Sequence, residues 1–230
     1  MEKLEEPLVG NPPRVNDRGK LISEDLANSI LEYSSITKGL QEQSKVDNLV
    51  ISDFGGGYGR TAYVFLKLHS NIRYVLVDLP LSLWTAQNYL SSVFSDKKIF
   101  KFRHFETFTE IEEQFERSDI VFFTPNQLEL LPNKVVDLFL NISSMHEMRK
   151  DTLKYYFGQV ERVTKGYFYF KQWKVSVIPY ENTIIGEQEY PIPQGWKRLY
   201  HRNCVFPSTF FEAMYLVGNS PRSVYDRIDT

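Results

Sequence analysis

The sequence predicts an α/β fold, a Rossmann-like sandwich built on a mostly parallel sheet. Short apolar runs typical of buried strands alternate along the chain with longer segments of helical spacing. The first run, Val50-Ile51-Ser52, leads through Asp53 into a cluster of glycines, and residues 61–68 have the pattern of a helix leaving that loop. Glycine permits positive φ and close approach of another molecule, and a helix start presents unpaired N–H groups. The order strand, glycine turn, helix therefore predicts a cradle for a polar ligand.

Length and composition favour one domain, 1–230, with an extended segment and helical cap at 1–47 and the core at 48–230. The formal net charge of −2 gives no electrostatic reason to expect nucleic acid or an anionic membrane as a partner. A single cysteine, Cys204, excludes an intrachain disulfide and suits a reducing compartment. The acidic N-terminal residues lack the apolar core of a signal peptide, and no run reaches transmembrane length. We therefore expect a cytoplasmic protein.

The N-terminal part is predicted to be extended over residues 7–20 and then helical from an N-cap at Ser23 to about Ile36. Two faces of this helix are distinguished by spacing, one with Leu26, Ile30 and Tyr33 and another with Asn28 and Glu32. Two interpretations stay open. The helix only packs on the sheet, or it also caps the ligand cleft and brings Glu32 or Tyr33 to a substrate.

Strands and helices continue to alternate along the rest of the chain. Further strands are predicted at residues 74–77, 119–123, 135–141, 166–170, 196–203 and 210–217. Helices are predicted at 82–93, with Ser82 as N-cap, and at 109–117 and 151–163. The stretch 175–195 is rich in proline and polar residues and is predicted to be a long loop, the kind of insertion that often carries function.

The spacing Asp53-x-Gly55-x-Gly57-x-Gly59, with Asp78 closing the next strand, resembles the first two motifs of class I S-adenosylmethionine-dependent methyltransferases. The resemblance implies that the loop passes under the methionine part of the cofactor and that the second acid accepts hydrogen bonds from both ribose hydroxyls. A carboxylate suits a diol, because it offers only acceptors and has several lone pairs.

A dinucleotide-binding loop is the alternative, since its fingerprint also follows a strand and opens a helix. Gly57-x-Gly59-x-x-Ala62 satisfies the loose form of that pattern. The match begins two residues later, however, and leaves Asp53, Gly55 and Gly56 without a role. The methyltransferase interpretation accounts for more of the loop.

The chain as a whole resembles the bacterial sugar O-methyltransferases, a family associated with surface-glycan biosynthesis. The resemblance implies a seven-stranded sheet with an antiparallel last strand, S-adenosylmethionine as cofactor, and a sugar hydroxyl of a glycan or glycan precursor as acceptor. It is carried by Gly10-Asn11-Pro12, Asn28-Ser29-Ile30-Leu31-Glu32-Tyr33, Gly55-Gly56-Gly57-Tyr58-Gly59-Arg60, Asn141-Ile142-Ser143-Ser144-Met145-His146-Glu147-Met148 and Gly166-Tyr167-Phe168-Tyr169-Phe170-Lys171-Gln172-Trp173.

The expected cofactor-binding residues lie at the ends of four predicted strands. They are Asp53, Phe54, Gly55, Gly56, Gly57, Gly59, Asp78, Leu79, Asn126 and Asn141. Asn126 belongs to the turn Pro125-Asn126-Gln127, which occupies the place where the fold usually contacts adenine. A solvent-facing turn is the alternative for that segment.

Methyl transfer to oxygen requires alignment of donor and acceptor and removal of the hydroxyl proton. In class I methyltransferases the segment after the fourth strand faces the transferred methyl group, so His146 is the candidate base, with Glu147 orienting the imidazole or acting itself. The alternative is that both residues only cap the following helix. Glu32, Tyr33, Lys171 and Trp173 are the candidate substrate-binding residues.

No metal is expected, because His146-Glu147-x-x-Lys150 lacks the second histidine of a zinc helix. The other histidines, His69, His104 and His201, are expected to be surface or structural residues. Three other functions stay open: a methyltransferase for a non-sugar small molecule, a nicotinamide-dependent oxidoreductase, and a binding domain that keeps the cofactor pocket without catalysis.

Overall fold

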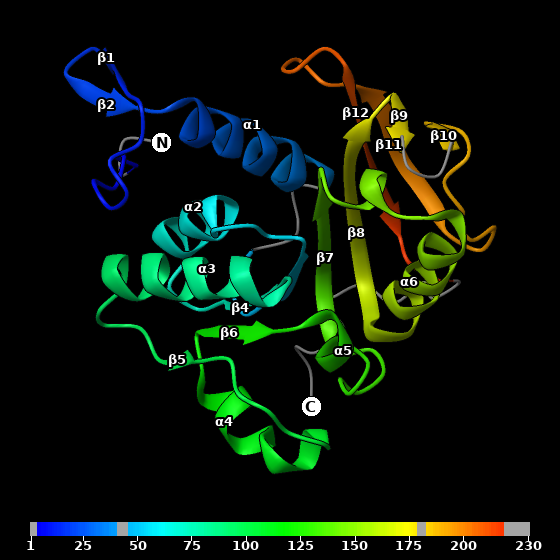
Figure 1. The fold of residues 1–230 in the computed structure, drawn as a ribbon, viewed down its shortest axis with the longest axis horizontal. Coiled ribbons are helices and arrows are strands. Elements are labelled where there is room, and N and C mark those ends of the chain that lie inside the picture. The colour runs from blue at the N-terminus through cyan, green and yellow to red at the C-terminus, as the bar shows by residue number, and fades with distance from the viewer. Residues whose placement is uncertain (1–3, 41–45, 179–182, 219–230) are drawn as a thin grey trace, which may run out of the picture.

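The computed structural model describes residues 4–40, 46–178 and 183–218 and contains a central sheet of eight strands (Figure 1). The strands are β3 (Val50–Phe54), β4 (Arg73–Val77), β5 (Ile99–Phe100), β6 (Ile120–Phe123), β7 (Val136–Ile142), β8 (Thr164–Trp173), β11 (Lys197–Asn203) and β12 (Phe210–Leu216). Their spatial order is β11-β12-β8-β7-β3-β4-β6-β5. β12 is antiparallel to both of its neighbours, whereas the pairings from β8 to β5 are parallel. The predicted α/β class and the reversed last strand are confirmed.

The sheet has one strand more than expected. The extra strand, β5, is two residues long and pairs with β6 at the edge of the sheet. Two residues are too few to show a period of two, so no sequence pattern indicated this strand.

The order in which the chain adds strands to the sheet reverses at the centre of the sheet. β3 pairs with β4 on one side and with β7 on the other, and the chain builds the sheet outward from β3 through β4 to β5 and β6 before it returns to form β7. In open parallel sheets ligands bind outside the carboxyl ends of the strands at such a switch point. The loops that follow β3, β4 and β7 are therefore the segments from which a site is built.

Helices cover both faces of the sheet (Figure 1). The buried apolar residues form two hydrophobic cores. The first contains residues of α1 (Glu24–Gly39), α2 (Arg60–Leu68) and α3 (Pro80–Val93). The other contains residues of α4 (Glu112–Arg117), α5 (Pro125–Leu128) and α6 (Lys150–Val163). Two short 3-10 turns are η1 (Phe108–Glu110) and η2 (Met145–Glu147). No helix in the described part of the chain is both long and apolar enough to cross a membrane.

The first helix starts as predicted, since the side chain of Ser23 accepts a hydrogen bond from the backbone N–H of Leu26 at 3.0 Å. Leu26 is buried, and Ile30 and Tyr33 are partly buried against the core, as their spacing predicted. The buried residues of the helix also include Ser29 and Glu32, so part of the second, polar face is buried too. The spacing rule was correct, but the polar Ser29 and Glu32 disguised the burial of that face, because buried charges are uncommon unless paired.

Other boundaries also moved. α3 begins at Pro80 with Leu79 as N-cap, so Ser82 lies inside the helix; proline is pre-organised for the first helical position. The predicted turn after β6 is the short helix α5, and β8 extends well beyond residues 166–170 at both ends.

Two hairpins form where no paired strands were predicted, one in and just after the segment predicted to be extended and one in the predicted long loop. β1 (Val15–Asp17) pairs with β2 (Lys20–Ile22), and β9 (Val175–Ile178) pairs with β10 (Thr183–Gly186). The second hairpin falls in the predicted long loop 175–195, where residues 179–182 lie outside the described ones. Short strands among polar and proline residues give too little alternation to detect.

Candidate active site

The glycine loop between β3 and α2 depends on backbone conformations that favour glycine. Gly55, Gly57 and Gly59 have φ of 78°, 57° and 95°. A Cβ on Gly55 would lie 2.2 Å from Ser144 Oγ, and one on Gly56 would lie 2.9 Å from Asp53 Oδ2. A Cβ on Gly57 would instead meet no described atom within 4 Å beyond its chain neighbours. Gly57 is therefore the point at which the loop backbone faces open space.

Asp78 joins the glycine loop to the end of β4. Its Oδ2 accepts the backbone N–H of Gly57 at 2.7 Å, and its Oδ1 accepts that of Leu79 at 2.7 Å. Each carboxylate oxygen has two lone pairs, so one acceptor position on each oxygen is left after these bonds. The half-buried carboxylate can hold the loop and still accept two hydrogen bonds from a diol.

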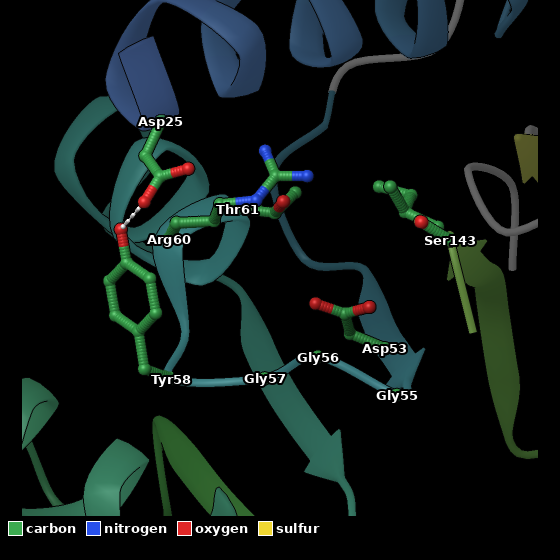
Figure 2. A pocket seen from close by; sticks show the side chains of 10 residues that line it. Asp25, Asp53, Gly55, Gly56, Gly57, Tyr58, Arg60, Thr61 and Ser143 are labelled. Carbon is green, nitrogen blue, oxygen red and sulfur yellow. Dashed lines mark hydrogen bonds between the residues drawn. The ribbon is translucent and has the colours of Figure 1, made fainter. Parts of the chain in front are cut away.

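A cavity of about 260 Å³ opens beside the loop (Figure 2). It is lined by Asp25, Asp53, Gly55, Gly56, Gly57, Tyr58, Arg60, Thr61, Ile142 and Ser143. In Figure 2 the carboxylate of Asp53 points toward Arg60 and Thr61, and Ser143 lies on the side of the cavity that follows β7. The predicted residues Asp53, Gly55, Gly56 and Gly57 thus meet in one place.

Asp53 is an almost fully buried carboxyl, 1% exposed. Burial raises its pKa to about 7, although the hydroxyl of Tyr74, which donates to Oδ2 at 2.8 Å, acts in the opposite direction. A carboxyl that titrates near neutrality beside a cavity will ionise more readily when a cation enters the cavity.

A buried ionic cluster lies behind Arg60. Glu32, 1% exposed, accepts hydrogen bonds from both guanidinium nitrogens of Arg60, at 2.7 and 3.0 Å, and from Lys171 Nζ at 2.9 Å. Burial alone would raise the pKa of Glu32, but the two cations outweigh it and the pKa lies below its usual value. The cluster joins α1, α2 and β8 and fixes the guanidinium at the wall of the cavity. The predicted substrate residues Glu32 and Lys171 therefore bind each other.

Tyr33 is directed elsewhere. Its hydroxyl lies 2.8 Å from His69 Nε2, and His69 Nδ1 lies 3.3 Å from Asp47 Oδ1. The ring of Tyr33 also makes an edge contact with Phe65 in α2. Tyr33 is not among the residues that line the cavity, and His69 has a structural partner, as expected.

Asn141 and Phe54 hold the glycine loop against the end of β7. The amide nitrogen of the fully buried Asn141 donates to the carbonyl of Phe54 at 2.7 Å and to Ser144 Oγ at 2.6 Å. Its Oδ1 accepts the backbone N–H of Met145 at 3.3 Å. Both predicted cofactor residues are thus engaged by protein groups and shape the loop rather than line the cavity. Gly59 also acts through packing, because its Cβ would lie 2.9 Å from Leu90.

The candidate base His146 sits on η2, a short turn that follows the end of β7 and the cavity-lining Ser143. Its Nδ1 lies 3.0 Å from Gln172 Oε1, and its Nε2 lies 3.6 Å from Glu147 Oε1. Burial lowers the pKa of His146, so the imidazole is neutral at neutral pH. Glu147 is largely exposed, with 73% of its side chain accessible.

Trp173 and the two remaining predicted residues lie at the surface. The ring of Trp173 makes an edge contact with His146 at 6.1 Å between centroids, packs at 4.8 Å on Phe210, and is 39% exposed. Leu79 is exposed at the start of α3 and Asn126 is exposed on α5. The side chain of Gln127, by contrast, caps α5 and donates to the carbonyl of Arg103.

Sequence reasoning missed several residues that line the cavity, namely Asp25, Tyr58, Arg60, Thr61, Ile142 and Ser143. Arg60 carried a usable signal, because it directly follows the last loop glycine at the start of a helix. Asp25 carried none: it reaches the site because the hydroxyl of Tyr58, in the glycine loop, donates to its Oδ2 on α1 at 2.8 Å (Figure 2).

A parallel sheet with one reversed strand near its end, and a glycine loop at its switch point, defines the Rossmann-like fold of class I S-adenosylmethionine-dependent methyltransferases. Comparison with solved structures supports this fold. The chain matches a SAM-dependent methyltransferase from Aquifex aeolicus with a TM-score of 0.57 at 13% identity, over 82% of this chain and 91% of that one.

Two further structures give the same result. A candidate sarcosine dimethylglycine methyltransferase from Galdieria sulphuraria matches with a TM-score of 0.60 at 11% identity, over 92% of this chain and 96% of that one. Magnesium protoporphyrin IX methyltransferase from Synechocystis PCC 6803, with bound SAM, matches with a TM-score of 0.57 at 10% identity, over 84% and 82%. No family model matches the sequence, and no curated protein matches it. These comparisons establish the fold.

Proposed function

We propose that this protein is an S-adenosylmethionine-dependent O-methyltransferase that acts on a sugar hydroxyl of a glycan or glycan precursor. One observation carries the proposal: the backbone of Gly57 faces open space while its N–H is held by Asp78, beside a cavity walled by the buried Asp53. The loop therefore offers exposed backbone to a ligand, with one acid holding it and another lining the adjacent cavity.

The residues present fit the proposed cofactor. Gly55 to Gly57 would contact the amino-acid part of the cofactor. The free acceptor positions of Asp78 suit the two ribose hydroxyls. Asp53 complements positive charge, which an ammonium and a sulfonium group both supply. Arg60 lies on the same wall and complements a carboxylate, although Glu32 already binds part of its guanidinium.

The bound cofactor would supply an electrophilic methyl carbon. The chain must then position the acceptor hydroxyl and take its proton. We assign the proton to His146 Nε2, since the ring is neutral at neutral pH and sits on the turn that follows the cavity-lining Ser143. Such a base contributes on the order of 100-fold or more, and alignment of the reactants contributes up to about 7–11 kcal/mol in favourable cases.

A sugar acceptor is supported by Trp173 and by the sequence resemblance. The half-exposed indole of Trp173 lies against the His146 ring and is held by Phe210. A fixed aromatic face suits the C–H face of a pyranose, whose hydroxyls then project toward neighbouring polar groups. Glu147 directly follows His146 in sequence, and Lys171 lies two residues before Trp173 but is bound to Glu32.

The sheet weighs against the dinucleotide alternative. The dinucleotide fold has the strand order 3-2-1-4-5-6 with parallel strands. Here β12 inserts antiparallel between β8 and β11. The two halves are therefore not equivalent mononucleotide-binding units.

The acceptor class is tested by incubating the protein with methyl-labelled S-adenosylmethionine and three acceptor sets: nucleotide sugars, a surface-glycan extract, and small phenols. We expect label in a sugar product. Label in a phenol alone would contradict the sugar assignment and keep methyl transfer. No label in any set, despite cofactor binding, would favour a binding domain without catalysis.

A further inference from the structure

We infer that Gln172 is a positioning residue that holds His146 in the tautomer with hydrogen on Nδ1, leaving the lone pair of Nε2 free to accept a proton. The assignment of the tautomer rests on hydrogen-bond geometry alone. Its catalytic consequence rests on the proposed function.

The amide orientation of Asn141 is fixed by two backbone groups. The carbonyl of Phe54 can only accept, so the group that faces it at 2.7 Å is the NH₂ of Asn141. The backbone N–H of Met145 can only donate, so the atom that faces it at 3.3 Å is the oxygen of Asn141. Asn141 therefore presents an acceptor, Oδ1, to its next neighbour.

That neighbour is Gln172, which is fully buried on β8. Its Nε2 donates to Asn141 Oδ1 at 2.5 Å and lies 3.4 Å from the carbonyl oxygen of Asn141. Its Oε1 accepts the backbone N–H of His146 at 3.2 Å. Turning the amide over would place NH₂ against this N–H and oxygen against two acceptors. Because buried unpaired polar groups are unfavourable, one orientation of the Gln172 amide is fixed.

The orientation of Gln172 determines the state of His146. The amide oxygen Oε1 of Gln172 can only accept a hydrogen bond, so Nδ1 of His146, 3.0 Å away, must be the donor. A neutral imidazole carries one N–H, and Nε2 is then the unprotonated nitrogen. A chain of two amides thus runs from the glycine loop, at the Phe54 carbonyl, to the imidazole.

One charged group near the ring favours a proton on the imidazole, namely the carboxylate of Glu147, but burial outweighs it and lowers the pKa of His146. Glu147 Oε1 lies 3.6 Å from Nε2, beyond hydrogen-bond distance. On β8, Lys171 is directed to Glu32, and Gln172 and Trp173 are uncharged. On β9, Ser176 Oγ donates to the carbonyl of His146 at 2.9 Å, and the strand carries no ionisable residue. Glu147 is therefore the charged group that faces the imidazole among the described residues.

The tautomer is read directly by ¹⁵N NMR of histidine-labelled protein without cofactor, at a pH where His146 is neutral, with His146→Asn used to assign its signals. We expect a protonated Nδ1 and an unprotonated Nε2. In Gln172→Leu the fixed preference should be lost. A protonated Nε2 in the wild-type protein would overturn the inference, and it would leave methyl transfer untouched.

Steady-state kinetics test the consequence. Gln172→Leu should lower kcat by about tenfold or more with KM for both substrates little changed, because a base in the wrong tautomer cannot act. Gln172→Glu keeps an acceptor and adds negative charge, so the acidic limb of the pH–rate profile should move to higher pH. Gln159→Leu, which removes a glutamine acceptor from Arg162 on α6, is the matched control. It should leave kcat and the pH–rate profile unchanged.

The outcomes separate the two claims. Suppose that Gln172→Leu loses kcat but the folded Gln172→Glu variant shows no shift in the acidic limb of its pH–rate profile. Gln172 would then only support packing, and this result would overturn the inference. Full activity of His146→Asn would reject the proposed base, whereas the tautomer measured by NMR would still decide the role of Gln172.

Discussion

The backbone N–H of Gly57 donates to Oδ2 of Asp78 at 2.7 Å, so the glycine loop and the acid that ends the neighbouring strand form one unit. Asp78 and the glycine loop are both expected to bind the cofactor, and each is held in place by this bond to the other. This relation changes what mutation of either residue would do, because each supports the other.

Replacing Asp78 by alanine should weaken binding of S-adenosylhomocysteine about tenfold or more. It removes the acceptors for a diol and leaves the N–H groups of Gly57 and Leu79 without their partner. The free energy of unfolding should also fall, by about 1–3 kcal/mol. Asp119→Ala is the control, since Asp119 accepts the backbone N–H of Lys98 at the amino end of β6, at the opposite end of the strands from Asp78. Equal binding by the two variants in calorimetry would reject the role of Asp78.

Replacing Gly57 by alanine should abolish detectable binding with a modest effect on folding. The residue has φ of 57°, where a Cβ is strained by about 1–2 kcal/mol, and that Cβ would occupy the open space above the loop. Gly10→Ala is a close match, with φ of 80° and open surroundings, but lies away from the cavity. If both variants lose the same stability and only Gly57→Ala loses affinity, the open space is a ligand site; unchanged affinity would argue against it.

Asp53 should make stability depend on pH in an unusual direction. Its pKa is raised to about 7 in the folded protein, so between about pH 4 and pH 7 the folded state holds a proton that the unfolded state has released. The stabilisation of the folded state by protonated Asp53 is therefore complete below about pH 4 and is lost as the pH rises to about 7. Asp53→Asn should flatten this part of the stability curve in denaturant titrations. An unchanged slope would show that Asp53 is already ionised.

The same carboxyl should couple cofactor binding to proton release. A cation in the cavity favours ionised Asp53, so binding near pH 6.5 should release protons and strengthen as the pH rises toward 7.5. Calorimetry in buffers of different ionisation enthalpy measures the release. Buffer-independent heats in the wild-type protein would contradict this coupling.

The buried cluster at Glu32 should be sensitive to loss of one partner. Glu32→Ala leaves Arg60 and Lys171 with uncompensated charge in a buried setting and should reduce the free energy of unfolding by about 3–5 kcal/mol. Glu113→Ala breaks an exposed pair with Arg117, both more than 70% accessible, and should change stability by less than about 1 kcal/mol. Comparable losses in the two variants would mean that the cluster is not a structural anchor.

The sequence predicted the parts of this site that lie on one continuous segment. Asp53 and the glycines follow from a strand, a turn and a helix that are neighbours in the chain, and Asp78 follows from the next strand. The fold class followed from the same alternation of apolar runs, and the reversed β12 from the resemblance.

Contacts between distant segments were not predictable. Glu32 was expected at a substrate, yet it meets Arg60 and Lys171 because α1 turns its polar stripe inward. Gln172 appeared only as part of a longer motif, and its bond to His146 depends on the parallel pairing of β7 and β8. Periodicity along one element carries no information about which partner another element provides.

Equilibrium calorimetry of S-adenosylhomocysteine against NAD tests the central proposal most directly, because both ligands suit a glycine loop followed by an acid. We predict saturable binding of S-adenosylhomocysteine that is lost in Gly57→Ala and kept in Gly10→Ala, and no binding of NAD. Tight binding of NAD with no heat from S-adenosylhomocysteine would contradict the proposal.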